Sequence, residues 1–257
     1  MRQHGIPSSL PAPLFLFRDV ERLKAHPSYT IAKAGDGRAA VLLVKALAKP
    51  LIEPAARAFG SGAMFVAPHA REATGENAIP MALASALAQG TKGRLDDEIV
   101  QANRVFHTGA DPMERMNARA AYDGSVSSDA RYVLVDDVLT MGGTLAELAD
   151  YLQRHGARVA GVVILVNAAR SGKLAPDERT IAKIKERFGD TIRDVFGIDP
   201  AALTAEEAQY LIGFRTPDEI RYRSIKAAEE TARRLYARGI RGLGAEGADH
   251  PGGAPCR

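Results

Sequence analysis

The chain has 257 residues and a mass of 27.5 kDa, and 46% of its residues are hydrophobic, enough to bury the core of one domain with a small appendage. A net charge of +3 is too small to indicate nucleic-acid binding, although a pI near 9.0 is compatible with anionic ligands. The single cysteine, Cys256, excludes a disulfide framework or a cysteine-rich zinc site within one chain. Because no apolar run reaches about 18 residues, we expect a soluble, cytoplasmic protein that neither spans a membrane nor binds nucleic acid.

The first part of the chain predicts a short α/β unit behind an irregular N-terminal segment, residues 1–27. Three prolines and no clear periodicity within residues 1–13 indicate a mobile terminus. Apolar spacing predicts a helix over 41–48 that breaks near Pro50 and resumes through residues 58–60. A strand over residues 63–66 and a helix from about residue 79 to 88, ending near Gly90, follow.

The middle of the chain predicts a weaker strand over 99–106 and then a long loop over 107–129, which shows no periodicity and is typical of lids and binding loops. Two fully apolar runs, 132–135 and 159–166, predict buried strands joined by a helix over 145–152. Parallel strands need such a crossover, so this stretch predicts a right-handed βαβ unit in a parallel sheet.

After Arg170 the sequence becomes helical. Residues 177–188 predict one helix, and two capping-box patterns predict the starts of two more, the last running to about residue 238. The pattern residues are Thr204 with Glu207, and Thr216-Pro217 with Glu219. We therefore expect an α/β core over residues 28–170, a helical C-terminal extension over 171–240, and a disordered tail over 241–257.

The segment VLVDDVLTMGGT, residues 133–144, combines an apolar run, two acids and a glycine pair between threonines. It predicts a strand ending at Asp136, a polar loop, and a helix from Thr144. Such a loop lies at the carboxyl edge of a sheet, where backbone N–H groups and a helix N-terminus bind anions such as phosphate. Gly142 and Gly143 allow positive φ and close approach to phosphate oxygens, whereas paired carboxylates suit a vicinal diol or a hard cation. An Asp-Asp turn before an N-capped helix is the alternative.

This segment resembles the phosphoribosyl pyrophosphate (PRPP) signature of type I phosphoribosyltransferases: four apolar residues, two acids, two variable residues and Thr-x-Gly-Gly-Thr. Met141 departs from the commonest form, in which a second threonine is usual. The resemblance implies the α/β fold of that family, a parallel twisted sheet flanked by helices. It implies that Asp136 and Asp137 are catalytic residues that address the ribose hydroxyls and the associated Mg²⁺, and that the 5′-phosphate is wrapped by Thr140, Met141, Gly142, Gly143 and Thr144.

Two further segments resemble the ComF-type, competence-linked branch of the family. His69, Ala70 and Arg71 follow the first predicted strand, where the family places its pyrophosphate loop, and Arg71 is a natural diphosphate ligand. Around the next glycine the branch has an arginine and an aromatic residue, where this chain has Thr74 and Glu76. The resemblance therefore implies pyrophosphate contacts from residues 69–71 and leaves further contacts open.

The second segment, ERMNARAAY at residues 114–122, resembles the Glu-Arg, Asn and aromatic segment of that branch, with tighter Arg-to-Asn spacing. The resemblance implies a flexible loop that closes over PRPP and brings Arg115 or Arg119 to the leaving pyrophosphate as catalytic residues. A plain surface position is the alternative for each arginine. Asn167 and Arg170 follow the last core strand, where an acceptor could be contacted, although a simple polar loop explains them equally well.

The resemblance implies an Mg²⁺-dependent phosphoribosyltransferase that moves the phosphoribosyl group of PRPP to a nitrogenous acceptor and releases pyrophosphate. A non-catalytic module of the same fold that senses PRPP or a nucleotide is the alternative, motivated by the missing pyrophosphate-loop residues. A PRPP synthetase is a weaker option, because no second nucleotide-binding motif is evident. The sequence leaves open the acceptor, the role of the extension and the oligomeric state, a homodimer included.

Overall fold

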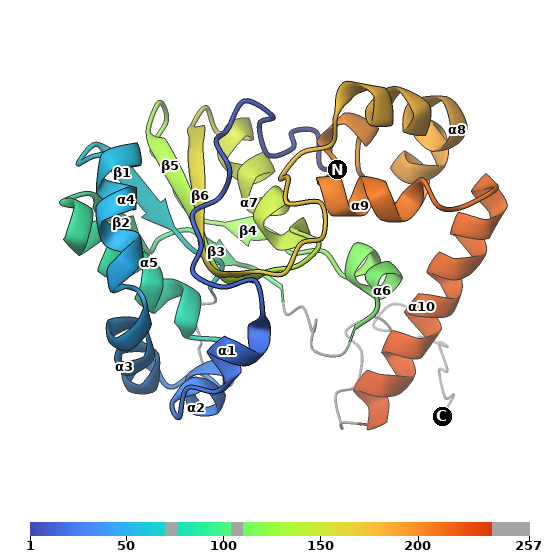
Figure 1. Ribbon diagram of the computed structural model, residues 1–257. Helices are drawn as coiled ribbons and strands as arrows, with labels where there is room; N and C mark the ends of the chain where they lie inside the picture. Colours follow the sequence, from blue (N-terminus) through green and yellow to red (C-terminus); the bar gives the residue numbers. More distant parts are fainter. Residues whose placement is uncertain (70–76, 104–109, 238–257) are drawn as a thin grey trace, which may run out of the picture.

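The computed structural model describes residues 1–69, 77–103 and 110–237, and a four-stranded parallel sheet of order β2-β1-β5-β6 lies at its centre (Figure 1). Its strands are β1 (Ala63–Val66), β2 (Arg94–Asp96), β5 (Arg131–Leu139) and β6 (Arg158–Asn167). A separate antiparallel pair consists of β3 (Val100–Gln101) and β4 (Tyr122–Asp123). The predicted α/β fold, a parallel sheet flanked by helices, is confirmed.

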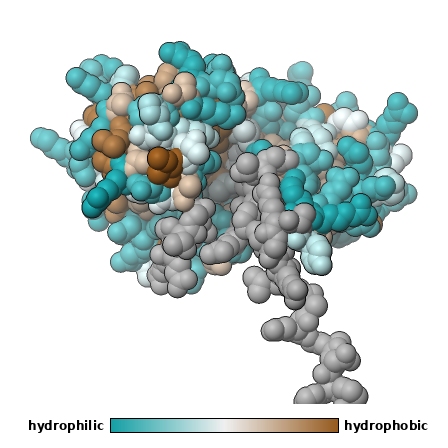
Figure 2. All heavy atoms as spheres, turned by 90° about the horizontal axis from the view of Figure 1, so that it is seen from below, coloured by the Kyte–Doolittle hydropathy of each residue, from teal (hydrophilic) through white to brown (hydrophobic). Residues whose placement is uncertain are grey.

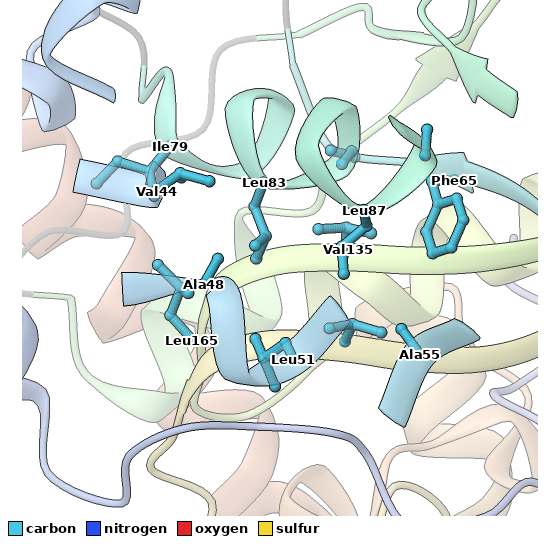
Figure 3. Close-up of a cluster of buried hydrophobic side chains, with 14 of the residues drawn as sticks. Val44, Ala48, Leu51, Ala55, Phe65, Ile79, Leu83, Leu87, Val135 and Leu165 are labelled. Carbon is cyan, nitrogen blue, oxygen red and sulfur yellow. The ribbon is translucent and has the colours of Figure 1, made fainter. Parts of the chain in front are cut away.

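Helices cover both faces of the sheet because its central strands are apolar on both sides. Phe65, Val135 and Leu165 belong to one core cluster with α3 (Gly37–Leu47), α4 (Lys49–Phe59) and α5 (Ile79–Thr91) (Figure 3). The alternate strand residues, among them Leu134 and Ile164, belong to a second cluster with α7 (Gly143–Arg154). This division follows from the two-residue period of a strand, which sends neighbouring side chains to opposite faces.

The C-terminal helices build a third core beside the sheet, at the right of Figure 1. They are α8 (Glu178–Phe196), the 3₁₀ turn η1 (Pro200–Ala202), α9 (Ala205–Leu211) and α10 (Pro217–Ala237). Met113 and Met116 of α6 (Pro112–Asn117) are buried in the same core. The predicted helical C-terminal extension is therefore present, and it packs against a segment from the middle of the chain.

The N-terminal segment packs along the sheet, so the prediction of a mobile terminus over residues 1–13 is wrong. Arg2 is fully buried, and its backbone pairs with Gly197 and Asp199 after α8. Leu14 and Phe17 form parallel bridges with β6. The sequence showed no periodicity there because these residues are held by partners far along the chain. The segment then enters α1 (Val20–Lys24) and α2 (Tyr29–Lys33), which were not predicted; the predicted tail, residues 241–257, lies outside the described residues.

The predicted helix break near Pro50 is present: α3 ends at Leu47 and α4 begins at Lys49, with Pro50 in the first turn, where a proline costs no hydrogen bond. The second helix starts there and not at residue 58. Two further predictions differ from the structure through local chemistry. The predicted loop over 107–129 contains α6, because Asp111 and Glu114 form a reciprocal capping box and Pro112 starts the helix. Of the predicted strand over 99–106, only β3 forms among its described residues.

Strand β5 is longer than predicted, and this changes the setting of the acids. It continues through Asp136 and Asp137 to Leu139 because β6 pairs with it along that length. Both aspartates therefore belong to the strand itself, and the loop begins only at Thr140.

The outer surface is mostly hydrophilic when seen from below, with apolar patches on the side of α2 and α3 (Figure 2). The exposed Ile31, Val41 and Leu42 lie on these two helices. Within the described ranges, no helix has both the length and the apolar character needed to cross a membrane.

Helix α6 is fastened to α10 by a buried carboxylate. Glu114 is 4% exposed, and its oxygens accept hydrogen bonds from Thr231 (2.9 Å) and Arg234 (3.0 Å) as well as from the Asp111 N–H (2.8 Å). Asn117 and Ser224 add two more hydrogen bonds of 2.8 Å. Burial alone would raise the pKa of Glu114, but the donors outweigh it and hold that pKa below the ordinary 4.5.

We expect Glu114→Gln to destabilise the protein by about 1–3 kcal/mol at pH 7, because hydrogen bonds to a charged group are lost. A lowered native pKa contributes stability above the unfolded-state pKa and loses it as the pH falls through the native value. The difference between wild type and variant, measured by urea unfolding, should therefore shrink from pH 6 to below pH 4. Glu219→Gln, at the exposed start of α10, is the control and should change stability little. A difference that does not vary with pH would contradict this account of Glu114.

Candidate functional site

A glycine loop, residues 140–144, connects β5 to α7 and presents an uncapped helix N-terminus. Gly142 has φ +76° and ψ 4°, a left-handed conformation that a side chain disfavours, and α7 has no side-chain cap. The first N–H groups of a helix have no partner within the helix. With the partial positive charge of the helix dipole, these donors form a site suited to an anion.

A pocket lies over this loop. Its walls are the loop itself, the end of β5, the segment that follows α6, and two acidic side chains from α7 and α9. The predicted site residues in its lining are Asp136, Arg115, Arg119 and all five residues of the loop, and Glu147 and Glu207 line it as well. The structure therefore brings the glycine loop, one acid of the pair and both arginines of the predicted closing segment to one place.

The two acids differ in their surroundings. Asp136 lines the pocket and is partly exposed, whereas Asp137 is 3% exposed and bonded to the Lys33 ammonium of α2 at 2.7 Å. Burial raises the pKa of Asp136 well above its ordinary value, the charge of Asp137 adds to this, and Lys33 opposes it. A cation near Asp136 would therefore favour its ionised form.

The chemistry of this pair can be compared with what Mg²⁺ requires. Mg²⁺ keeps most of its water and binds through one or two carboxylates plus substrate phosphates. Asp136, at the pocket, fits that role, and one oxygen of Asp137 is already bound to Lys33. Within the described residues no group of three or more His, Cys, Asp or Glu side chains is arranged to hold a metal.

The two arginines have different partners. Arg115 of α6 donates from Nη1 to the Thr140 hydroxyl at 2.9 Å, so it already touches the glycine loop. Burial lowers its pKa, and the charges of Asp111 and Glu114 oppose this. Arg119 instead forms a bidentate pair with Glu147 of α7, with distances of 2.6 and 2.7 Å, and donates to the carbonyls of Phe196 and Gly197 at the end of α8. Arg119 thus joins the sheet domain to the extension.

The predicted pyrophosphate residues are only partly described. His69 follows β1 at the carboxyl edge of the sheet, is partly exposed, and contacts the Ala67 carbonyl through Nδ1 at 3.1 Å. Ala70 and Arg71 lie outside the described residues. Asn167, considered for the acceptor, is 2% exposed, and its Oδ1 accepts a hydrogen bond from the Ala169 N–H, so it shapes its own loop.

Several residues near the site were not found from the sequence. Lys33 and Arg2 lie more than 100 positions from their acidic partners, and no local pattern marks them. Tyr122 is the aromatic residue of the predicted closing segment, but the sequence did not indicate that it donates to the Thr144 carbonyl, at 3.2 Å. Burial, with smaller contributions from Asp136 and Glu147, raises its pKa. The capping box of Thr204 was visible in the sequence, but its contact with the glycine loop was not.

Comparison with known proteins agrees with this arrangement. Residues 78–201 match the family model described as phosphoribosyl transferase domain. Residues 78–201, nearly half of the chain, are therefore similar to a phosphoribosyl transferase domain. The match begins and ends later than the predicted core, 28–170, whose bounds remain a proposal.

Related proteins include a protein named TraN and a phosphoribosyltransferase. Protein TraN of Escherichia coli is 32% identical over 225 residues, 85% of this chain and 50% of that protein. The hypoxanthine/guanine phosphoribosyltransferase of Aciduliprofundum boonei is 31% identical over 78 residues, 30% of this chain and 37% of that enzyme. The chain thus spans half or less of these relatives. These matches confirm the resemblance to phosphoribosyltransferases and are consistent with its ComF-type branch.

A solved adenine phosphoribosyltransferase of Rhodothermus marinus aligns with a TM-score of 0.36 and 16% identity, covering 63% of this chain and 80% of that chain.

Replacing Lys33 by Met should destabilise the protein, because it removes the cation that pairs with the buried Asp137. Removing one partner leaves Asp137 buried and charged, so we expect a loss of about 2 kcal/mol; the partial exposure of Lys33 keeps it below the value for a fully buried pair. Urea unfolding measures it. Lys24→Met, which breaks an exposed pair with Glu21, is the control and should cost well under about 1 kcal/mol. The double variant Lys33→Met with Asp137→Asn should recover most of the loss, and failure to do so would contradict the electrostatic explanation.

Proposed function

We propose that the pocket over the glycine loop binds PRPP with Mg²⁺ and that the chain is a phosphoribosyltransferase, transferring the phosphoribosyl group to a nitrogenous acceptor. The observation that carries the proposal is the uncapped N-terminus of α7, with Gly142 at positive φ, opening into a pocket that also holds Asp136. A phosphoryl group and a ribose diol are the two groups that these elements suit, and PRPP carries both.

In this proposal each part of the site has a separate task. The N–H groups and hydroxyls of residues 140–144 hold the 5′-phosphate, and Asp136 accepts hydrogen bonds from the ribose hydroxyls. Bound Mg²⁺ would neutralise the diphosphate and contact Asp136, with Asp137 behind it. Arg115, already on Thr140, is positioned to add positive charge above the loop.

The transfer itself needs little covalent help from the protein. The bond from C1 of the ribose to the pyrophosphate oxygen breaks, a bond from C1 to the acceptor nitrogen forms, and that nitrogen gives up a proton. Positioning and charge stabilisation are the larger contributions in such a step. We further propose His69, Ala70 and Arg71 as pyrophosphate contacts, since His69 lies at the same edge of the sheet as the acids.

One observation favours the sensing alternative. Arg119, predicted to reach pyrophosphate, uses Nε and both terminal nitrogens on Glu147 and on the end of α8. Helix α6 is also fastened to α10 through Glu114. Binding of a ligand to the glycine loop would therefore alter contacts with the C-terminal extension. A PRPP- or nucleotide-sensing module requires such a coupling.

Binding of PRPP tests the proposal. Wild type should bind PRPP in the presence of MgCl₂ by calorimetry, and at 100 times its Kd the ligand should add about 2.7 kcal/mol to stability. The double variant Asp136→Asn with Asp137→Asn should lose most of this binding while the protein stays folded. Wild type that does not bind PRPP would overturn the proposal.

Turnover then separates the two functions. Pyrophosphate release is measured with PRPP, MgCl₂ and a panel of purine and pyrimidine bases and amines. Release that depends on one acceptor supports the enzyme, whereas tight PRPP binding without release for any acceptor supports the sensor.

Two glycines at opposite ends of α7 offer a matched comparison. Gly142 (φ +76°) and Gly156 (φ +83°) both adopt left-handed backbone, so alanine should cost each about 1–2 kcal/mol. Only Gly142 belongs to the glycine loop. We expect Gly142→Ala to weaken PRPP binding about tenfold or more and Gly156→Ala to leave it unchanged, as measured by calorimetry. Equal effects of the two variants would show that the loop has no special role.

A further inference from the structure

One side of the glycine loop is formed by the start of α9, outside the matched domain. Thr204 Oγ1 donates to the Met141 carbonyl at 2.6 Å, and the Thr204 methyl group lies 3.5 Å from the position that a Cβ on Gly142 would take. Glu207 Oε1 lies 3.1 Å from the corresponding position on Gly143. A side chain at 143 would therefore press on Glu207, whereas a Cβ at 142 would be in ordinary van der Waals contact with Thr204, so the loop and the start of α9 are packed against one another.

The contact from Thr204 fixes the orientation of a peptide group. No peptide bond in the described residues is cis, and in a trans peptide the carbonyl and the following N–H point in opposite directions. Holding the Met141 carbonyl toward Thr204 therefore directs the Gly142 N–H away from α9. Without that hydrogen bond the peptide could turn over, because glycine tolerates both orientations.

Glu207 would oppose an anion on the loop unless its charge were balanced. Arg2 pairs with both Glu207 and Glu147, and Arg119 pairs with Glu147. These four side chains, the buried charge cluster, hold two positive and two negative charges, and Arg2 is fully buried while both glutamates are under 10% exposed. At a buried position, solvent and salt screen an unpaired carboxylate only weakly, so its negative charge would repel a nearby anion strongly.

We propose that Thr204 and Glu207 of α9, together with Arg2, are positioning residues that hold the glycine loop in the shape and charge state that accepts a phosphoryl group. This rests on the proposed phosphoryl binding at the loop. All three residues lie outside residues 78–201, the segment that matches the family model. The extension and the N-terminal segment are thus working parts of the phosphoryl site.

The first test compares two threonine caps. Thr204 and Thr216 both cap helices through Oγ1, but only Thr204 contacts the loop. Ribose 5-phosphate is the probe, because it carries the phosphoryl group without the diphosphate; its Kd is measured by calorimetry and the unfolding midpoint without ligand. Thr204→Val should weaken binding about tenfold, as expected for one hydrogen bond at the upper end of its range. Thr204→Ser should restore binding to within about twofold, and Thr216→Val should leave it unchanged.

The second test addresses the charge of Glu207. It also tests the proposal independently if a Thr204 variant fails to fold. Arg2→Met leaves Glu207 unbalanced and should weaken ribose 5-phosphate binding, whereas Arg2→Met with Glu207→Gln should recover most of the affinity, since the amide keeps the shape without the charge. A merely structural role for Arg2 predicts equal affinity losses in the single and double variants.

The outcomes are distinct. If wild type binds neither PRPP nor ribose 5-phosphate, the proposed function and this inference both fail. If wild type binds and Thr204→Val binds equally well, or no more weakly than Thr216→Val, the inference fails and the proposed function stands.

Discussion

The balance of four charges beside the glycine loop, three of them buried, is the constraint on which the site depends. Arg2 and Arg119 are cations from two distant segments, and Glu147 and Glu207 are their anions from α7 and α9. Removing such groups from water is costly, and ion pairing repays that cost only when every charge has a partner. The cluster therefore forms only when four separate segments meet, which makes it a condition for correct assembly more than a source of stability.

This condition links the sheet to the extension. Glu147 belongs to the helix whose N-terminus forms the proposed anion site, and through Arg119 it is linked to the last carbonyls of α8. Glu207 caps α9 beside the loop and meets Arg2 in the same cluster. Helix α6 is tied from the other direction, by Glu114 to α10 and by Arg115 to Thr140. The predicted closing segment, residues 114–122, thus contacts both the glycine loop and α10, so a closing motion of this segment would have to break these contacts or carry α10 with it.

The sequence was sufficient to predict those elements whose structure depends on residues close to them along the chain. The apolar runs at 132–135 and 159–166 predicted two buried parallel strands, and the capping box at Thr204 predicted the start of α9. The paired acids and glycines predicted which loop would face the pocket. It was insufficient where distant partners decide. Strand β5 runs past Asp136 because β6 lies beside it, and Arg2 is buried because Glu147 and Glu207 are folded next to it. The capping box of α6 is a local pattern that the sequence contains. It was not used to predict a helix, because the helix is too short to show a repeating apolar pattern.

The same long-range contacts explain why the choice between enzyme and sensor depends on the extension more than on the loop. The loop and Asp136 need only to hold a phosphoryl group and a ribose, and either function requires that much. Catalysis additionally requires positive charge free to meet a leaving diphosphate, whereas the guanidinium of Arg119 is committed to Glu147 and α8. Arg115 contacts the loop, and its position depends on α10, because α10 holds α6 through Glu114. Movement of α10 relative to the sheet would therefore displace α6 and, with it, the Arg115 guanidinium beside the glycine loop.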